Sequence, residues 1–197
     1  MAKPSTPVQP PRRRRADAER NVAAILDAAL EALASDPDTS MSEIARRAGV
    51  VRATIYLHFP TREALLDAVM EHATSQVVEA MRGAEPQRGE PVEALERVLK
   101  ATWRQLAHFH GLLALNTARL SAEELHRRHV PMLDQLEPLV ERGQRQGLFR
   151  RDLPVAWHLA VIRAIVHTAS RELQAGRLAE RDVEATMIST ALAAISD

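Results

Sequence analysis

The chain has 197 residues with 26 Lys and Arg, 26 Asp and Glu and no Cys, a length that allows one or two domains. The lack of Cys excludes disulfides and thiolate metal sites and fits a reducing compartment. No apolar run reaches the roughly 20 residues that span a bilayer, and no apolar stretch of a signal peptide follows the basic amino terminus. We therefore expect a cytoplasmic protein without membrane contact.

The composition predicts an all-α fold of about nine helices. Aromatic residues make up only 3% of the chain, and runs with the alternation of a strand are missing. We expect an arm over residues 1–15, a helix-turn-helix domain over 16–62 and a larger helical domain over 63–197. Residues 1–62 hold ten Lys and Arg against seven Asp and Glu, a net charge of +3, and the rest has −3. The positive net charge therefore makes residues 1–62 the part of the chain that is suited to bind phosphates.

The arm contains four prolines followed by Arg12–Arg15, a composition typical of disorder. It either lies along a DNA backbone or minor groove or is a solvated tail, and the sequence leaves both possibilities open. A helix is predicted after it, from about residue 17 to residue 34. The apolar stripe of this helix consists of Val22, Ile25, Leu26, Ala29, Leu30 and Leu33.

The next stretch predicts two short helices joined by a tight turn. Ser40 is a good N-cap and Glu43 follows three residues later, so the pair predicts a capping box. Gly49 supplies the left-handed residue that ends this helix. A second helix is expected over residues 52–58 and ends before Pro60. This is the helix-turn-helix plan, in which the second helix enters the major groove of DNA.

The second helix is predicted to bury Ile55 and Phe59, which are four residues apart. Its outward face then carries a Tyr, a Leu and a small residue, which suits base edges, thymine methyl groups and phosphates. The alternative is a surface helix with an incidental aromatic residue. The predicted DNA contacts are Ser40, Ser42, Arg52, Ala53, Thr54, Tyr56, Leu57, His58 and Arg62.

The segment I-A-R-R-A-G-V-V-R-A-T-I-Y-L-H-F-P-T-R-E-A-L resembles the DNA-binding signature of TetR-family transcriptional regulators. With the preceding R-N-V-A-A-I-L-D-A-A-L, the resemblance covers residues 16–66. Val51 departs from it, since many members carry Ser or Thr there, and Arg62 stands where many carry Lys. The resemblance implies a homodimer on a pseudo-palindromic operator of double-stranded DNA, more often a repressor than an activator. It also implies a small-molecule effector that tilts the helix after the helix-turn-helix.

That helix is predicted from Thr61, its N-cap, to about Met81. We expect Pro131 and Pro138 to kink or split one later helix, and Pro154 to lie in the first turn of another, with the cap at residue 152 or 153. The later helices are placed near residues 91–109, 112–120, 122–146, 154–175 and 180–195.

The helix over 154–175 has apolar residues on nearly all sides, as a helix buried on both sides does. The last helix also has a broad apolar face. We infer a homodimer in which these two helices of each subunit form a four-helix contact. The apolar residues of the first of them are Trp157, Leu159, Val161, Ile162, Ile165, Val166 and Ala169.

No sequence motif of a catalytic or cofactor site is present, so no catalytic residue, cofactor or metal is expected. Glu123 and His126 match half of a di-iron signature, but the chain lacks the second half. His126 and His129 lie three apart and could bind a metal, yet no third ligand is evident. The protein is therefore not expected to be an enzyme.

The second domain is instead expected to hold a pocket for the unknown effector. His167 lies either in this pocket or at the dimer contact, and every pocket candidate has the alternative of an ordinary core or interface residue. A bundle enzyme and an architectural DNA binder without an effector remain the rival functions. The pocket candidates are Trp103, Leu106, His110, Leu113, Asn116, Met132, Trp157 and Arg163.

Overall fold

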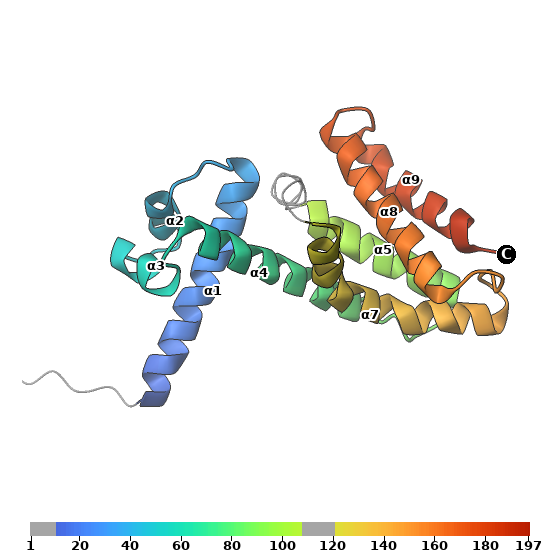
Figure 1. The fold of residues 1–197 in the computed structure, drawn as a ribbon, viewed down its shortest axis with the longest axis horizontal. Coiled ribbons are helices and arrows are strands. Elements are labelled where there is room, and N and C mark those ends of the chain that lie inside the picture. Colours follow the sequence, from blue (N-terminus) through green and yellow to red (C-terminus); the bar gives the residue numbers. More distant parts are fainter. Residues whose placement is uncertain (1–10, 108–120) are drawn as a thin grey trace, which may run out of the picture. The chain divides into compact units, whose positions relative to one another are not determined.

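The computed structural model describes residues 11–107 and 121–197, and these residues form eight α-helices and no strand (Figure 1). The predicted all-α fold is confirmed. The chain divides into two compact units, which we call the N-terminal unit, Met1–Val69, and the C-terminal unit, Met70–Asp197. None of the helices in the described ranges is both long and apolar enough to cross a membrane.

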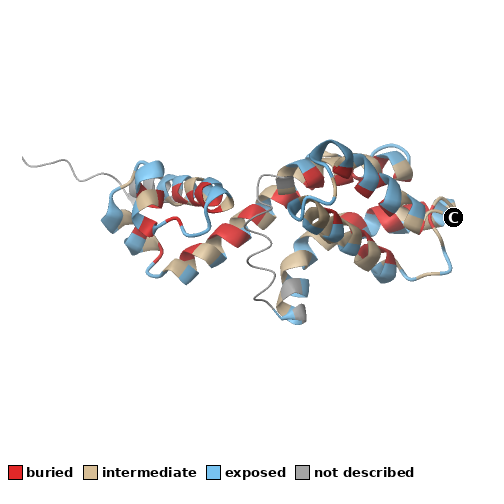
Figure 2. Cartoon of the chain, turned by 90° about the horizontal axis from the view of Figure 1, so that it is seen from above, coloured by how far each residue is buried: buried red, intermediate tan, exposed pale blue. Residues whose placement is uncertain are grey.

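The N-terminal unit holds α1 (Pro11–Ser35), α2 (Met41–Arg47), α3 (Arg52–His58) and the first turns of α4 (Arg62–Gly83). Helix α2 packs on α1 and on α3. The apolar residues that these helices turn toward one another are buried (Figure 2). The core of this unit consists of Ile25, Ala29, Leu30, Ala32, Leu33, Met41, Ile44, Ala45, Ile55, Phe59, Leu65 and Val69.

Helix α1 begins at Pro11, earlier than predicted. The prediction of an arm outside the helix is therefore wrong for residues 11–15, and residues 1–10 lie outside the described residues. Proline suits the first position of a helix, because its missing N–H is one that the helix leaves without a partner. Arginine is a good helix former, so the basic run continues the helix from there.

The C-terminal unit contains the rest of α4 with α5 (Pro91–Ala107), α7 (Ala122–Gln146), α8 (Val155–Gln174) and α9 (Glu180–Ile195). Helix α8 packs on α7 and α9, and α5 packs on the same two helices. The predicted helix near 112–120 lies outside the described residues. The core is apolar along the facing sides of these helices (Figure 2).

Of two proline predictions for the C-terminal unit, one agrees with the structure and one differs from it. Helix α7 is kinked and not split, since Pro131 and Pro138 both lie inside it and its first turns run in a different direction from the rest (Figure 1). Pro154 is the N-cap of α8 and not a residue of its first turn. Its φ of −63° and ψ of 147° are extended, which proline adopts without strain.

The connection between α7 and α8 packs against the end of the chain. The Phe149 ring is fully buried and lies so close to Gly143 that a Cβ there would overlap it. Arg150 donates its backbone N–H to the Ile195 carbonyl at 2.9 Å, and an isolated bridge pairs Phe149 with Ser196. Gly147 ends α7 with a φ of 72°, the left-handed cap that glycine adopts cheaply.

Candidate functional site

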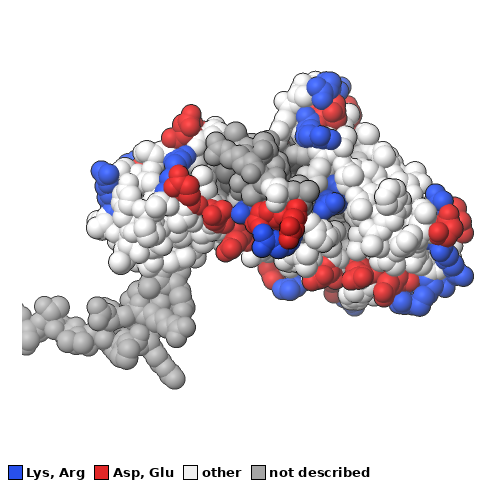
Figure 3. Space-filling model, viewed as in Figure 1, with Lys and Arg blue, Asp and Glu red and all other residues white. Residues whose placement is uncertain are grey.

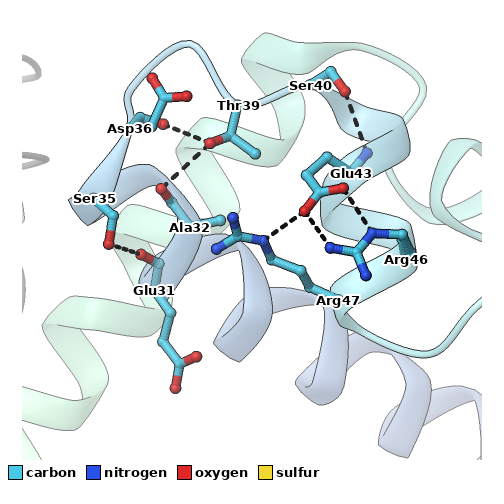
Figure 4. Close-up of polar contacts among 9 residues, drawn as sticks. All are labelled: Glu31, Ala32, Ser35, Asp36, Thr39, Ser40, Glu43, Arg46 and Arg47. Carbon is cyan, nitrogen blue, oxygen red and sulfur yellow. Dashed lines mark hydrogen bonds and ion pairs between the residues drawn. The ribbon is translucent and has the colours of Figure 1, made fainter.

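Helix α2 is capped by Ser40, whose Oγ accepts from the Glu43 backbone N–H at 3.2 Å (Figure 4). The Glu43 carboxylate turns away from this cap, so only half of the predicted capping box forms. It accepts from Arg46 at 2.6 and 2.8 Å and from Arg47 at 2.9 Å. Hydrogen bonds from Arg46 and then Arg47 lower the pKa of Glu43 to about 2. The carboxylate therefore neutralises part of the basic charge on α2.

The turn between α2 and α3 has the predicted geometry. Gly49 has a φ of 68°, and α3 begins after Val51, which makes no side-chain capping hydrogen bond. Valine has no side-chain acceptor, so the N-cap residue offers the first backbone N–H groups of α3 no side-chain partner. The exposed fraction of Val51 is 70%.

Helix α3 presents the face that the sequence predicted. Ile55 and Phe59 are buried at 0% and 7% exposure, which confirms their inward position. The Arg52 guanidinium lies over the Tyr56 ring, 5.4 Å from its centroid, an arrangement that stabilises both side chains. Leu57 is 78% exposed. The outward residues are Arg52, Ala53, Tyr56 and Leu57, with Thr54 and His58 half-buried beside them.

Arg62, at the start of α4, donates to the backbone of the α1–α2 loop. Its guanidinium reaches the Thr39 carbonyl at 2.6 Å and the Pro37 carbonyl. Thr39 is buried, and its hydroxyl donates to the Asp36 carbonyl at 2.7 Å (Figure 4). Arg62 therefore anchors α4 to this loop, and a phosphate contact would use its remaining donors. Ser42 is exposed on α2.

A largely apolar cavity of about 140 Å³ lies in the C-terminal unit among α4, α5, α7 and α8. Three of its lining residues are methionines, whose flexible side chains adapt to ligands of different shape. The apolar lining consists of Met70, Ala73, Val77, Met81, Leu99, Leu106, Met132, Leu133, Leu136, Ile162 and Val166.

The polar lining of this cavity gathers mainly on α8. His167 of α8 and His129 of α7 lie with their Nε2 atoms 2.8 Å apart, and their rings meet edge to face. Burial, then the neighbouring charges of His129, Arg163 and Arg171, lower the pKa of His167 to about 4. The polar lining consists of Thr74, Thr102, His129, Arg163, His167, Ser170, Arg171 and Gln174.

The structure brings some of the predicted pocket residues together and separates others. Leu106, Met132 and Arg163 line the cavity. Trp103 is buried without lining it, and Trp157 is 56% exposed on α8. The candidates outside the described residues are His110, Leu113 and Asn116.

Sequence reasoning left His167 undecided and missed the other polar lining residues apart from Arg163, namely Thr74, Thr102, His129, Ser170, Arg171 and Gln174. A signal was present, because Arg163, His167 and Arg171 follow one another at intervals of four on one face of α8. Within the described ranges, no group of three or more His, Cys, Asp or Glu is placed to hold a metal ion. His126 is exposed on α7, whereas His129 turns to His167.

The outer face of α8 and α9 carries few charged side chains. In Figure 3 the surface over these helices is nearly free of Lys, Arg, Asp and Glu. Trp157 of α8 is 56% exposed, and an exposed Trp beside a sparsely charged surface is typical of a protein–protein contact. The exposed small residues of the two helices are Ala156, Ala164, Thr168, Ala185, Thr186, Ser189, Thr190 and Ala193.

Two family models match this chain. "Bacterial regulatory proteins, tetR family" matches residues 25–69, and "Tetracyclin repressor-like, C-terminal domain" matches residues 91–195. The transcriptional repressor LfrR of Mycolicibacterium smegmatis is 30% identical over 171 residues, which are 87% of this chain and 88% of LfrR.

Two solved structures have the same fold. A TetR transcription regulatory protein from Mycobacterium vanbaalenii is 36% identical with a TM-score of 0.61, over 83% of this chain and 98% of the other. LfrR in complex with proflavine is 23% identical with a TM-score of 0.65, over 88% and 94%. Together with the exposed helix α3, these matches show that the chain is a DNA-binding transcriptional regulator of the TetR family.

Proposed function

We propose that this regulator is a repressor that binds a pseudo-palindromic operator as a homodimer and leaves it when a small molecule occupies the cavity of the C-terminal unit. The similarity to the repressor LfrR supports repression. The LfrR structure in complex with proflavine supports a small-molecule effector. Because such a protein acts on DNA, we place it in the cytoplasm.

The exposed face of α3 supports the assignment of the DNA contacts. We assign Arg52 and Ala53, at the first turn of α3, to base edges, because the first turn of a recognition helix meets them. Tyr56 and Leu57 meet backbone and base edges. The remaining assigned contacts are to phosphates, and they come from Thr54, His58 and Arg62 and from Ser40 and Ser42 at the start of α2.

The sparsely charged outer face of α8 and α9 supports a two-fold dimer. A two-fold contact pairs the same surface of both subunits, so Trp157 and the exposed small residues of α8 and α9 would meet their copies in a four-helix contact. Such a dimer presents two α3 helices to DNA. Their separation has to be about 34–36 Å for both to enter successive major grooves on one side of the duplex.

Helix α4 carries the coupling between ligand and DNA in this proposal, and its continuity is the observation on which the proposal rests. Its first residue, Arg62, is anchored to the α1–α2 loop. Later residues of the same helix, from Met70 to Met81, line the cavity. A ligand that binds one position of α4 better than another shifts the population toward that position. The two α3 helices then no longer have the separation that binding to DNA requires.

The test is selection from a library of random duplex DNA by the purified full chain at moderate salt, with sequencing of the retained fragments. An enriched inverted repeat with half-sites one DNA turn apart is the expected result. Salt-sensitive retention of bulk DNA without enrichment would overturn the operator proposal in favour of an architectural DNA binder.

A further inference from the structure

We propose that the cavity of the C-terminal unit takes a small carboxylic acid with an apolar body, whose carboxylate is held by Arg163 and Arg171 of α8. The inference rests on the proposed role of this cavity as the effector site, and it names the chemical class of the effector.

The charges along the cavity favour an anion. Two guanidiniums and two imidazoles line it, and none of the described lining residues is Asp or Glu. An ammonium or amidinium group would be desolvated there beside like charges with no carboxylate to pair with, which is costly. A carboxylate finds donors in the fork geometry that guanidinium groups offer to its two oxygens.

The two guanidiniums have donors to spare. Within the described residues Arg163 makes no hydrogen bond or ion pair, although it is half-buried against the cavity. The side-chain partner of Arg171 is the Thr168 hydroxyl at 3.3 Å, which leaves most of its five N–H groups available. A half-buried guanidinium without an anion lacks the interaction that normally offsets its desolvation.

The helical spacing on α8 gives the cavity a basic side and an apolar side. Arg163, His167 and Arg171 recur at intervals of four and form a basic stripe, whereas Ile162 and Val166 lie beside it and continue the apolar wall. Residues at these intervals share one helix face. An amphipathic acid matches this division, with its charged end on the stripe and its body against the methionines of α4 and α7.

The imidazole pair adds a neutral donor or acceptor to the basic stripe. In the contact between the Nε2 atoms of His129 and His167 one ring donates and the other accepts, so the accepting ring is a neutral imidazole. Burial is the main cause of the low pKa of His167, and the positive charges of Arg163 and Arg171 lower this pKa further. An anion placed there would be attracted by the same two charges.

The cavity volume limits the size of the acid. About 140 Å³ is available, and one water needs on the order of 10–15 Å³ of such space. The cavity therefore holds a ligand of roughly ten non-hydrogen atoms. Longer chains would require the methionine side chains to move.

The test compares three ligands with the same chain and different head groups: octanoate, octanol and octylammonium. Each is titrated calorimetrically into the full-length protein at pH 7.5. We expect octanoate to bind most tightly. Arg163→Gln and Arg171→Gln should each weaken octanoate by about 10- to 100-fold, the usual effect of losing a charge-assisted hydrogen bond, and leave octanol binding unchanged.

Arg145→Gln is the matched control, because Arg145 makes an exposed ion pair with Glu141 on α7 and does not line the cavity. Its octanoate affinity should equal that of the wild type. Octanol or octylammonium binding as tightly as octanoate would overturn the inference, and so would binding of none of the three. Equal octanoate affinity in the wild type and both arginine variants would overturn it too.

The release of DNA is measured separately, with the operator found by the library selection. If octanoate binds through the two arginines but leaves operator affinity unchanged, the ligand class stands and the proposed release mechanism fails. If a neutral or cationic ligand binds and releases the operator, the release mechanism stands and the ligand class is wrong.

Discussion

His129 of α7 and His167 of α8 meet through their Nε2 atoms at 2.8 Å, and this contact joins two helices that line the cavity. One ring must donate and the other accept, so the accepting ring has to be a neutral imidazole. Protonation of both rings would leave two donors facing each other beside Arg163 and Arg171. The contact is therefore formed at neutral pH and opposed by acid.

The first prediction is a loss of stability in acid that depends on His167. The pKa of His167 is lowered to about 4 in the folded protein, against about 6.5 in an unfolded chain. Between these values the unfolded state binds more protons, so the free energy of unfolding decreases as the pH falls from about 6.5 to about 4. Because the ring is partly exposed, the effect is reduced by solvent to about 1–2 kcal/mol.

Urea unfolding at several pH values measures this effect. His167→Gln should reduce the decrease in stability between pH 6.5 and pH 4, while His126→Gln, a change at an exposed histidine of α7, should leave it as in the wild type. A wild-type pH profile retained by His167→Gln would contradict the assignment.

The second prediction concerns Gly143 in α7. A Cβ at this position would overlap the buried ring of Phe149, so Gly143→Ala should destabilise the protein by about 1–3 kcal/mol through overpacking. Gly83→Ala is the control, because no atom lies within 4 Å of a Cβ at Gly83 and its φ is not left-handed. Thermal unfolding should show a lower Tm for the first variant and an equal or higher Tm for the second. Equal Tm values would show that the connection between α7 and α8 accommodates the methyl group.

The sequence predicts those features of this protein that depend on neighbours a few residues apart. The cap at Ser40, the left-handed Gly49 and the inward side of α3 all follow from local spacing. Helix α1 begins earlier than the sequence predicts, because its basic run is typical of disorder by composition while arginine is also a good helix former.

Contacts between residues distant in the chain could not be predicted in the same way. Arg62 reaches carbonyls 23 and 25 residues away, and His129 meets His167 across 38 residues. Such pairs depend on how helices pack, which helical periodicity does not specify. For the same reason Trp157 is a pocket candidate by its sequence pattern, whereas its position on α8 turns it to the surface.

The third prediction tests the face of α3. Tyr56 is 38% exposed, so Tyr56→Ala should leave the folded protein stable and weaken operator binding by about 1–3 kcal/mol, the usual contribution of a good contact to a base edge. Gel-shift titration with the selected operator measures this change. Val130→Ala is the control, since Val130 is 37% exposed on α7 outside the proposed interface. Unchanged operator affinity of Tyr56→Ala would remove this residue from the assigned contacts.

The fourth prediction tests the dimer. Ala164 is exposed on the outer face of α8, where Ala164→Glu would place a charge without a partner in the proposed contact, at a large cost. We expect monomers by light scattering with an unchanged helical circular dichroism spectrum. Ala23→Glu makes the same change at an exposed position of α1 and should remain dimeric. A dimer in both variants would exclude this face of α8 as the contact.

The last prediction concerns the charge on α2. Glu43 pairs with both Arg46 and Arg47, so Glu43→Gln removes one negative charge and leaves two exposed guanidiniums without their carboxylate. If α2 lies along the DNA backbone, the two guanidiniums can then neutralise phosphates. The affinity for unrelated duplex DNA should increase several-fold, and it should depend more steeply on salt concentration. Glu79→Gln frees Arg82 on α4 from a similar exposed pair, and it changes the net charge of the chain equally. A difference between the two variants therefore reports the position of α2 and not the total charge, whereas an equal increase in both would place α2 away from the DNA.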